Sequence, residues 1–422
     1  MASSTTAFAP LKESLFRKIW GSSFVSNVGA WMYNVGVSWS AATMSAAPLM
    51  ISLMQTASSL PSFLFSYVAG VTSDRVDRRK LIIRIQLTLF AILVALTIFT
   101  WLNLLNIYLL LVFTFLIGSC TAFVTPVWDS ITSEVVSPEN LKPAIALEGV
   151  NFNLARAVGP ALGGLLLTVK GILSVFIFTA ISALAPVFGV YSWKNKATPA
   201  PTVSFRKSAI EGWQAFRESK AFPLLLVRTL SFTAFISTLF ALLPQLSKYQ
   251  WKQTSSQFTF LWVSLGLGAF LGSYLLSLVT KSVKPSSIIY YSCLIVATGL
   301  FLLTTTTNTI LIYGILFITG IGWISAIATI NVLAQQLSPA PYKGRFLSIN
   351  TTVFQGSLAL SSAGWGWLAG QLTTLKVFEI ASITMIVLST LVMFLLPMPA
   401  EVDPSVTVTS PTPQVVPVQK TR

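Results

Sequence analysis

The chain has 422 residues, of which 54% are hydrophobic and 9% charged, and its mean hydropathy is +0.76. Soluble globular domains carry about 25% charged residues, so this composition excludes a water-soluble fold. With no histidine and two isolated cysteines, Cys120 and Cys293, the sequence offers no spacing for a metal site or a disulfide framework. We therefore expect no metal and no cofactor, and the lack of a Gly-x-x-x-x-Gly-Lys-Ser/Thr loop excludes a nucleotide-driven pump.

Long uncharged runs predict the membrane spans, because a charge at mid-bilayer costs about 2.5–3.5 kcal/mol on insertion scales. In the first half, the runs place spans in residues 19–73 (two, with a turn near 46–48), 85–128 (two, with a break near 103–106), 142–170 and 171–193. In the second half, they place spans in residues 222–248, 252–281, 285–342 (two, with a break near 306–309), 345–376 and 379–401. The sequence therefore predicts an all-α membrane protein with twelve transmembrane helices.

The distribution of lysine and arginine predicts the orientation of these spans. With the N-terminus in the cytoplasm, 21 of the 27 basic residues lie in cytoplasmic segments and four in outer ones. Such an excess marks the cytoplasmic side of membrane proteins. We therefore expect a multi-pass protein of the plasma (inner) membrane of a prokaryote, with both termini cytoplasmic. The net charge of +15 then reflects topology and attraction to anionic lipid, not to nucleic acid.

A central polar stretch and a weak internal echo predict two halves. Gly163 and Gly364 are 201 residues apart, and so are Lys142 and Lys343. Two six-helix bundles with a binding site near the midplane between them are a transporter architecture. The expected division is a cytoplasmic segment at 1–14, a six-helix bundle at 15–193, a cytoplasmic linker at 194–220, a second six-helix bundle at 221–398 and a disordered cytoplasmic tail at 399–422.

The loop between the second and third spans carries a recognisable motif. Residues 70–80 read GVTSDRVDRRK, which resembles the Gly-x-x-x-Asp-Arg-x-Gly-Arg-Arg-Lys signature of the major facilitator superfamily, with Asp77 at the second glycine. Glycine permits close helix contact, and aspartate can pair with arginine or occupy a helix N-terminus. We expect a conformational latch composed of Gly70, Asp74, Arg75, Arg78, Arg79 and Arg345. The alternative is a plain basic cytoplasmic loop.

Four further stretches resemble one exporter branch of that superfamily. Residues 26–32, 125–141, 153–164 and 343–345 are similar to enterobactin exporters and macrolide-efflux-like proteins, and the resemblance covers about residues 15–398. It implies the major facilitator fold and export of a small molecule. Ala30 stands where many relatives carry an acid, so the resemblance does not imply a proton-carrying first span.

The fifth span contains a glycine-proline motif. Gly159, Pro160, Gly163 and Gly164 resemble the antiporter motif of the superfamily, which implies export rather than uptake. Proline removes a backbone donor and bends a helix, whereas glycine lets a neighbouring helix approach closely. The alternative is a packing kink without directional meaning.

Three charged residues fall inside spans. Arg156 lies 13 residues beyond Pro143, or about 20 Å along a helix, which places it near the midplane. We expect Arg156 and Asn153 to face a central cavity and to contact substrate or coupling ion; the alternative for Arg156 is a structural role toward carbonyls or, through water, toward Glu148. Glu148 is the best-placed proton carrier. Arg228 is about six residues inside the seventh span, so we expect it to snorkel to the inner interface, with substrate contact as the alternative.

The resembling family lines its cavity with the first, fourth, seventh and tenth spans. Asn27, Trp31 and Asn34 share one face of the first span, at spacings of four and three residues. Trp323 and Asn331 lie in the tenth. Aromatic and amide groups with few charges suit an amphiphilic organic compound, whereas the alternative for the tryptophans is helix packing.

Together these features predict a secondary transporter, not an enzyme. It exports a small organic, amphiphilic compound by alternating access, as a monomer and in antiport with protons or another coupling ion. The alternatives are an uptake symporter of the same fold and a non-transporting membrane sensor or scaffold. The expected partners are therefore a small-molecule substrate, the coupling ion and membrane lipid, with no nucleic acid.

Overall fold

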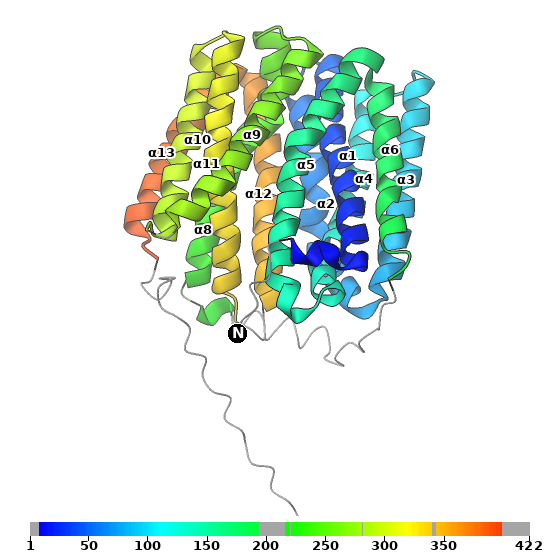
Figure 1. The fold of residues 1–422 in the computed structure, drawn as a ribbon. Coiled ribbons are helices and arrows are strands. Elements are labelled where there is room, and N and C mark those ends of the chain that lie inside the picture. The colour runs from blue at the N-terminus through cyan, green and yellow to red at the C-terminus, as the bar shows by residue number, and fades with distance from the viewer. Residues whose placement is uncertain (1–7, 194–215, 220, 281, 340–342, 399–422) are drawn as a thin grey trace, which may run out of the picture.

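The computed structural model describes residues 8–193, 216–219, 221–280, 282–339 and 343–398, without the side chains of residues 67, 71, 73–75, 129, 130 and 133. Twelve α-helices of 18 to 31 residues make up most of this part of the chain, and it contains no strand (Figure 1). The predicted all-α fold is therefore confirmed. The predicted tail and most of the predicted linker lie outside the described residues.

The helices run in one continuous series. The first six are α1 (Ser14–Met44), α2 (Pro48–Arg75), α3 (Arg78–Trp101), α4 (Ile107–Val135), α5 (Leu141–Lys170) and α6 (Ile172–Gly189). The last six are α8 (Ala221–Gln245), α9 (Ser255–Val279), α10 (Pro285–Thr305), α11 (Thr309–Gln336), α12 (Lys343–Gln371) and α13 (Thr374–Leu395). A π-helical turn, Leu246–Gln250, follows α8.

Polar caps begin helices where the uncharged runs break. Asn106 Oδ1 accepts two backbone N–H groups of the first turn of α4, at 3.1 and 3.0 Å. Asn308 does the same for α11, at 3.0 and 3.4 Å. Asparagine at this position satisfies donors that have no partner inside the helix. The breaks predicted near 46–48, 103–106 and 306–309 are confirmed.

The last helix begins earlier than predicted. α13 starts at Thr374 rather than at residue 379, because the hydroxyl of Thr373 accepts the backbone N–H of Lys376 at 3.3 Å and caps the helix there. Glu379 consequently lies in the second turn of α13 and does not mark its start.

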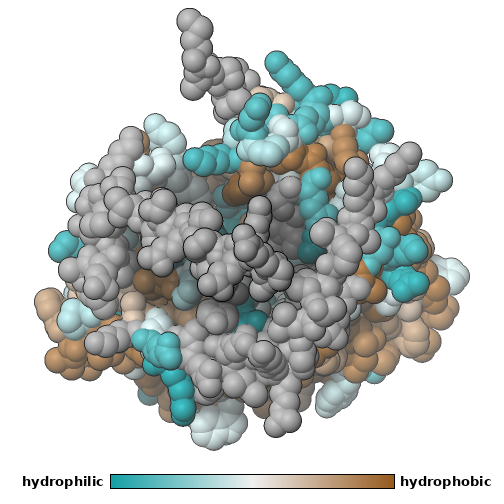
Figure 2. All heavy atoms as spheres, turned by 90° about the horizontal axis from the view of Figure 1, so that it is seen from below, coloured by the Kyte–Doolittle hydropathy of each residue, from teal (hydrophilic) through white to brown (hydrophobic). Residues whose placement is uncertain are grey.

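The two ends of the helical body carry different contacts. Figure 1 shows the start of α1 at the lower end, where α13 also ends; we call this end the terminal face and the opposite end the distal face. At the terminal face, Glu13 Oε1 accepts hydrogen bonds from Ser137 Oγ at 3.2 Å and Asn140 Nδ2 at 2.7 Å, which ties the start of α1 to the α4–α5 connection. Seen from this end, hydrophobic residues lie along parts of the rim, and hydrophilic residues lie around the area that is drawn in grey (Figure 2).

Two helix pairs make most of the contact between the first six helices and the last six, and we call this boundary the seam. α2 packs on α12 and α5 packs on α9. Thr56 Oγ1 of α2 donates to the Ala359 carbonyl of α12 at 2.8 Å, and Gly356 lies against the ring of Phe63. Small residues therefore bring these helices close, as is common between membrane helices.

Nine helices of the described chain are long and apolar enough to cross a membrane. The long helices outside this set are α1, α2 and α12. All three contribute to the seam, where α2 and α12 contact each other and α1 contacts α8 and α9. Helices covered by other helices need fewer apolar residues than helices that face lipid, so their lower hydropathy follows from their position.

Candidate functional site

Arg156 lies in the middle of α5 and is 7% exposed. Its guanidinium carbon lies 4.5 Å from the ring centre of Trp323, 4.9 Å from that of Phe152 and 5.3 Å from that of Trp31. We call these three rings the aromatic cage. Trp31 and Phe152 belong to the first six helices and Trp323 to the last six, so the cage spans the seam.

The guanidinium inside the cage has hydrogen-bond donors that no described acceptor satisfies. Within the described chain, Nε and Nη1 of Arg156 are buried without a hydrogen-bond partner, as is Oδ1 of Asn153. None of the described acids forms an ion pair with Arg156; Glu148 is two helical turns away. Unsatisfied buried charges are costly, because the ring faces offset only part of the lost hydration. Phe152, 45% exposed, is the most accessible ring of the cage.

The glycines of the fifth-span motif position the cage. A Cβ atom at Gly159 would lie 2.5 Å from Cβ of Trp31, and a Cβ atom at Gly163 would lie 3.0 Å from Cα of Met32. Both positions therefore require glycine for α1 to pack directly on α5. This close contact brings Trp31 over the guanidinium.

The other half of the motif faces α9 across the seam. Pro160 has no N–H to donate to the Arg156 carbonyl four residues earlier. Gly266 of α9 lies against this carbonyl, with 3.0 Å between its ideal Cβ position and the oxygen. A Cβ atom at Gly164 would overlap the side chain of Thr259, also on α9. The motif thus forms a close contact between the two sets of helices directly beside Arg156.

The predicted polar face of α1 contributes to helix packing. Asn27 Nδ2 donates to Asn151 Oδ1 at 3.1 Å, and Asn151 Nδ2 donates to the Trp20 carbonyl at 2.8 Å and to Ser23 Oγ at 2.9 Å. Asn151 is fully buried. Asn27 therefore fastens α1 to α5 through a side chain that the sequence interpretation did not include.

The remaining predicted cavity residues fall into two groups. Trp31 and Trp323 meet at Arg156 in the cage. Asn34 is half-buried one turn beyond Trp31, and Asn331 is exposed, two turns beyond Trp323 on α11. The structure therefore brings the two tryptophans to the cation and leaves Asn331 away from it.

Phe152 is the cage residue that the sequence interpretation missed. It precedes Arg156 by four residues, so both lie on one face of α5. This spacing was the available signal, because an aromatic ring one turn from a buried cation is placed to cover it.

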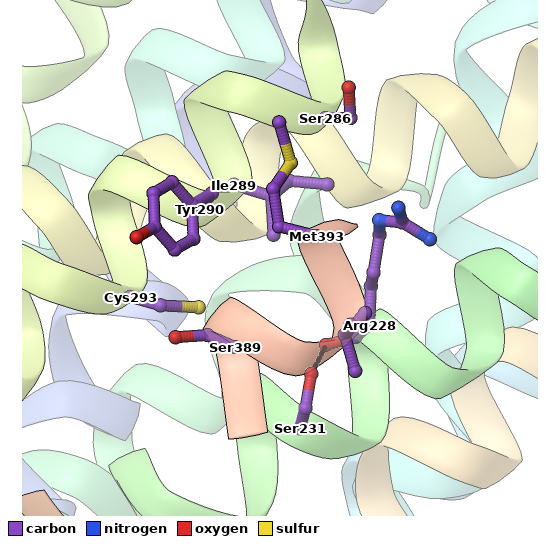
Figure 3. A pocket seen from close by; sticks show the side chains of 9 residues that line it. Arg228, Ser231, Ser286, Ile289, Tyr290, Cys293, Ser389 and Met393 are labelled. Carbon is purple, nitrogen blue, oxygen red and sulfur yellow. Dashed lines mark hydrogen bonds between the residues drawn. The ribbon is translucent and has the colours of Figure 1, made fainter. Parts of the chain in front are cut away.

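Arg228, near the start of α8, occupies a different kind of site (Figure 3). It is 3% exposed, and its Nη1 and Nη2 donate to the Leu224 carbonyl at 3.2 Å and to the Leu396 carbonyl at 2.8 Å. The prediction was that this side chain snorkels to the inner interface; in the structure it reaches the end of α13 at the terminal face, where the Leu396 carbonyl accepts its hydrogen bond in place of water. Arg228 therefore fastens α8 to α13.

A small pocket adjoins this contact between α8, α10 and α13. Figure 3 shows the guanidinium directed away from Tyr290 and Cys293. The pocket is lined by Arg228, Ser231, Ser286, Ile289, Tyr290, Cys293, Ser389, Val392 and Met393. It lies within the last six helices, apart from the seam.

Two arginines of the predicted latch bind within the first six helices. Arg78 forms an ion pair with Glu134 near the end of α4. Arg79 Nη2 donates to the Tyr191 carbonyl, beyond the end of α6, at 2.6 Å. These contacts fix the start of α3 at the terminal face.

For the other members of the predicted latch, the structure describes fewer side-chain contacts. The side chains of Asp74 and Arg75 lie outside the described residues. No described side chain or backbone atom lies within 4 Å of an ideal Cβ position at Gly70, so the close helix contact expected there stays a prediction, whereas Gly164 makes one with α9. Arg345 lies in the first turn of α12, at the terminal face.

The distal face is closed across the seam. The Tyr249 hydroxyl donates to the Ala42 carbonyl at 2.8 Å and the Ser45 carbonyl at 3.2 Å, and Gln245 Nε2 donates to the Ala46 carbonyl at 3.2 Å. We call this set of hydrogen bonds the distal clasp. It joins the end of α8 to the end of α1.

An all-helical membrane fold with a buried cation between two sets of six helices defines a membrane transporter rather than an enzyme. A family model described as transmembrane secretion effector matches residues 5–421, so the chain belongs to that family of the major facilitator superfamily. The predicted superfamily is thereby confirmed, and so is the prediction that the protein is not an enzyme.

Known relatives share the length of the chain. It is 25% identical over 389 residues to "Enterobactin exporter EntS" of Shigella flexneri, covering 90% of this chain and 91% of that protein. It is 25% identical over 390 residues to EntS of Salmonella typhi, covering 90% and 92%. Among solved structures, it is similar to a POT family transporter (TM-score 0.69, 12% identity, 90% and 95% covered). It is also similar to the nucleoside transporter NupG (TM-score 0.67, 12% identity, 90% and 99% covered). These two solved structures have the same fold as this chain.

Proposed function

We propose that this transporter exports a small organic, amphiphilic compound across the plasma membrane by alternating access, in antiport with protons. Twelve helices cross the membrane in two six-helix bundles, residues 15–193 and 221–398, and the protein acts as a monomer. Both termini lie in the cytoplasm, so the terminal face is cytoplasmic and the distal face is external.

The observation that carries the proposal is the aromatic cage around Arg156. Burying a cation without a hydrogen-bonded counter-charge costs free energy in a core that does not move. The same cation can serve as a binding group where a substrate binds and is released. The cage is built from both bundles, so any rocking of one bundle against the other opens or closes it. The distal clasp matches a state closed to the outside.

Three features favour export over uptake. The family is described as secretion effectors, and the relatives are named enterobactin exporters. The motif at Gly159 to Gly164 resembles the antiporter motif and forms the α5–α9 contact beside the cage.

Glu148, two turns from Arg156 toward the terminal face on the same helix, is the proton carrier of the proposed antiport.

Cysteine accessibility tests alternating access at the cage. We expect Asn153→Cys, in a Cys120→Ser/Cys293→Ser background, to react with a membrane-impermeant maleimide from the cytoplasmic side in the resting protein. After a proton gradient and substrate are applied, it should become reactive from the outer side. Ser292→Cys, at a position that is 3% exposed within the last six helices, is the matched control and should stay unlabelled. A thiol introduced at position 153 that is sealed from both sides, or open to one side under every condition, contradicts the proposal.

Transport direction needs a separate measurement. A panel of amphiphilic compounds is compared in cells with and without the protein, and hits are tested in inside-out vesicles with an acidic lumen. Export predicts uptake into these vesicles, and Glu148→Gln should remove its dependence on the proton gradient. An uptake symporter predicts flux of the opposite sign, and a sensor or scaffold predicts no flux.

A further inference from the structure

A row of aromatic rings leads away from Arg156 toward the distal face. Its first ring is Trp323, and successive ring centres are 5.0, 5.9, 6.5 and 5.2 Å apart. A second cation, Lys248, lies 5.1 Å from the centre of the last ring. We call the row the aromatic ladder; its rings, in order from Arg156, are Trp323, Phe240, Trp262, Phe258 and Trp39.

The ladder spans the distal half of the protein. Trp323 is in the middle of α11, whereas Phe258 is in the first turn of α9 and Lys248 is in the turn after α8, both at the distal face. Gly266, opposite Arg156, is eight residues beyond Phe258, or about 12 Å along α9. The ladder therefore covers the distance between the cage and the outer end.

The ladder crosses the seam at both of its ends. Arg156 of the first six helices contacts Trp323 of the last six, and Trp39 of the first six contacts both Phe258 and Lys248 of the last six. Movement of one bundle against the other would therefore separate the contacts at the two ends and expose the faces of Trp323 and Trp39. The rings between them, Phe240, Trp262 and Phe258, belong to the last six helices and line the path from that side.

Buried polar groups along the ladder point to a ligand with acceptor oxygens. Trp262 Nε1, like Nε and Nη1 of Arg156, is buried without a hydrogen-bond partner in the described chain. Indole and guanidinium nitrogens are donors only, so a carboxylate or another oxyanion satisfies them and an ammonium does not. The rings offer stacking surfaces for an aromatic group.

From this geometry we infer that the transported compound is an aromatic organic anion, and that the aromatic ladder is its exit route. The acid group binds Arg156, the ring enters the cage in place of Phe152, and the ring then passes along the ladder as the distal face opens. Lys248 attracts the acid group at the outer end. This inference rests on the proposed export function and adds the substrate class and the path.

Binding of three matched probes tests the substrate class. The probes are 2-naphthoate, 2-naphthalenemethanol and 2-naphthylmethylammonium, which share one ring system and differ in charge, and the measurement is titration calorimetry of the protein in nanodiscs. We expect naphthoate to bind about ten- to a hundredfold more tightly than the alcohol, as a charge-assisted hydrogen bond provides. The ammonium compound should bind most weakly. Arg156→Gln should remove this order, and Arg228→Gln, the matched buried arginine, should retain it.

Efflux of 2-naphthoate from proteoliposomes tests the path. Lys248→Gln should slow efflux about two- to fivefold, the range of a surface charge contact, without changing affinity at Arg156. Lys252→Gln, the exposed lysine four residues further on, should have no effect.

The outcomes separate this inference from the proposed function. Equal binding of the three probes, an unchanged order in Arg156→Gln, or no naphthoate binding at all overturns the substrate class, while alternating labelling of the Asn153→Cys variant would still support transport. Loss of that labelling pattern overturns alternating access, on which the proposed export function depends. Equal efflux in the two lysine variants overturns the ladder as the route.

Discussion

Arg156 and Arg228 are both buried in helices, yet their surroundings differ in kind. Arg228 is 3% exposed and donates to two carbonyls, one of them at the end of α13. Arg156 is 7% exposed and meets three ring faces, with two nitrogens left without hydrogen bonds in the described chain. The first arginine lies within the last six helices, and the second lies where the two sets of helices meet.

This difference separates a structural charge from a functional one. A cation that holds one fixed arrangement can have its donors satisfied by fixed acceptors. A cation that must bind a ligand and release it retains free donors, and ring faces stabilise it without occupying them. Two experiments on the arginines test this contrast directly, and two more test the helix contacts that surround the Arg156 site.

The largest expected effect is on transport by Arg156 variants. Arg156→Gln should reduce the efflux rate of 2-naphthoate roughly a hundredfold, because it removes a charge-assisted hydrogen bond worth up to about 3 kcal/mol. Arg156→Lys should retain part of the rate, since it keeps the charge but loses the planar fork of donors. Initial rates in proteoliposomes measure both. A wild-type efflux rate in Arg156→Gln would contradict a role for Arg156 in transport.

Stability should respond in the opposite order. Arg228→Met should lower the stability of the fold by about 2 kcal/mol, because the carbonyl at the end of α13 loses a charged donor. Arg156→Met should change it by less than about 1 kcal/mol, because the lost cation–π contacts are offset by removal of an unsatisfied buried charge. Cys120 and Cys293 are buried and free, so a thiol-reactive dye reports unfolding on heating. Equal melting shifts for the two variants would contradict the contrast.

Close helix contact beside Arg156 should also matter. Gly164→Ala places a methyl group into the Thr259 side chain and should slow transport several-fold, since overpacking costs about 1–3 kcal/mol. Gly149→Ala, on the same helix with open space around its Cβ position, is the control and should have the wild-type rate. If both variants transport equally well, movement at the α5–α9 contact does not limit the cycle.

The smallest effect is expected at the distal clasp. Tyr249→Phe removes two hydrogen bonds to α1 and should shift the population toward the externally open state about three- to tenfold. External labelling of a cysteine introduced by Asn153→Cys measures this shift. Tyr274→Phe, at an exposed position on α9, should leave labelling unchanged, and an effect as large as that of Tyr249→Phe would argue against a specific clasp.

The helices could be predicted from the sequence because their determinants are local. Uncharged runs, the asparagine caps at 106 and 308, and the prolines that begin α2 and α10 act within a few residues. The sequence motifs likewise predicted the superfamily, and the family match over residues 5–421 confirms this prediction. The four-residue spacing between Phe152 and Arg156 is equally local, although the sequence interpretation did not use it.

The partners of the buried charges could not be predicted, because they come from distant parts of the chain. Leu396 is 168 residues from Arg228, and nothing near Arg228 indicates that a helix end would replace water as its acceptor. The contact between Trp323 and Arg156 likewise requires α9, which packs on both α5 and α11 and so brings the two residues together. Tertiary packing therefore determines whether a buried guanidinium finds hydrogen-bond acceptors, as that of Arg228 does, or ring faces, as that of Arg156 does.

The distal clasp has a consequence for how this protein can change during evolution. The acceptors of Tyr249 are main-chain oxygens of residues 42 and 45, and every amino acid supplies such an oxygen. Substitutions on the α1 side therefore leave the interaction intact as long as the helix ends at the same place. Inheritance of the closure depends on the two donor side chains, Gln245 and Tyr249, so among descendants of this gene these two residues should change less than the residues that accept from them.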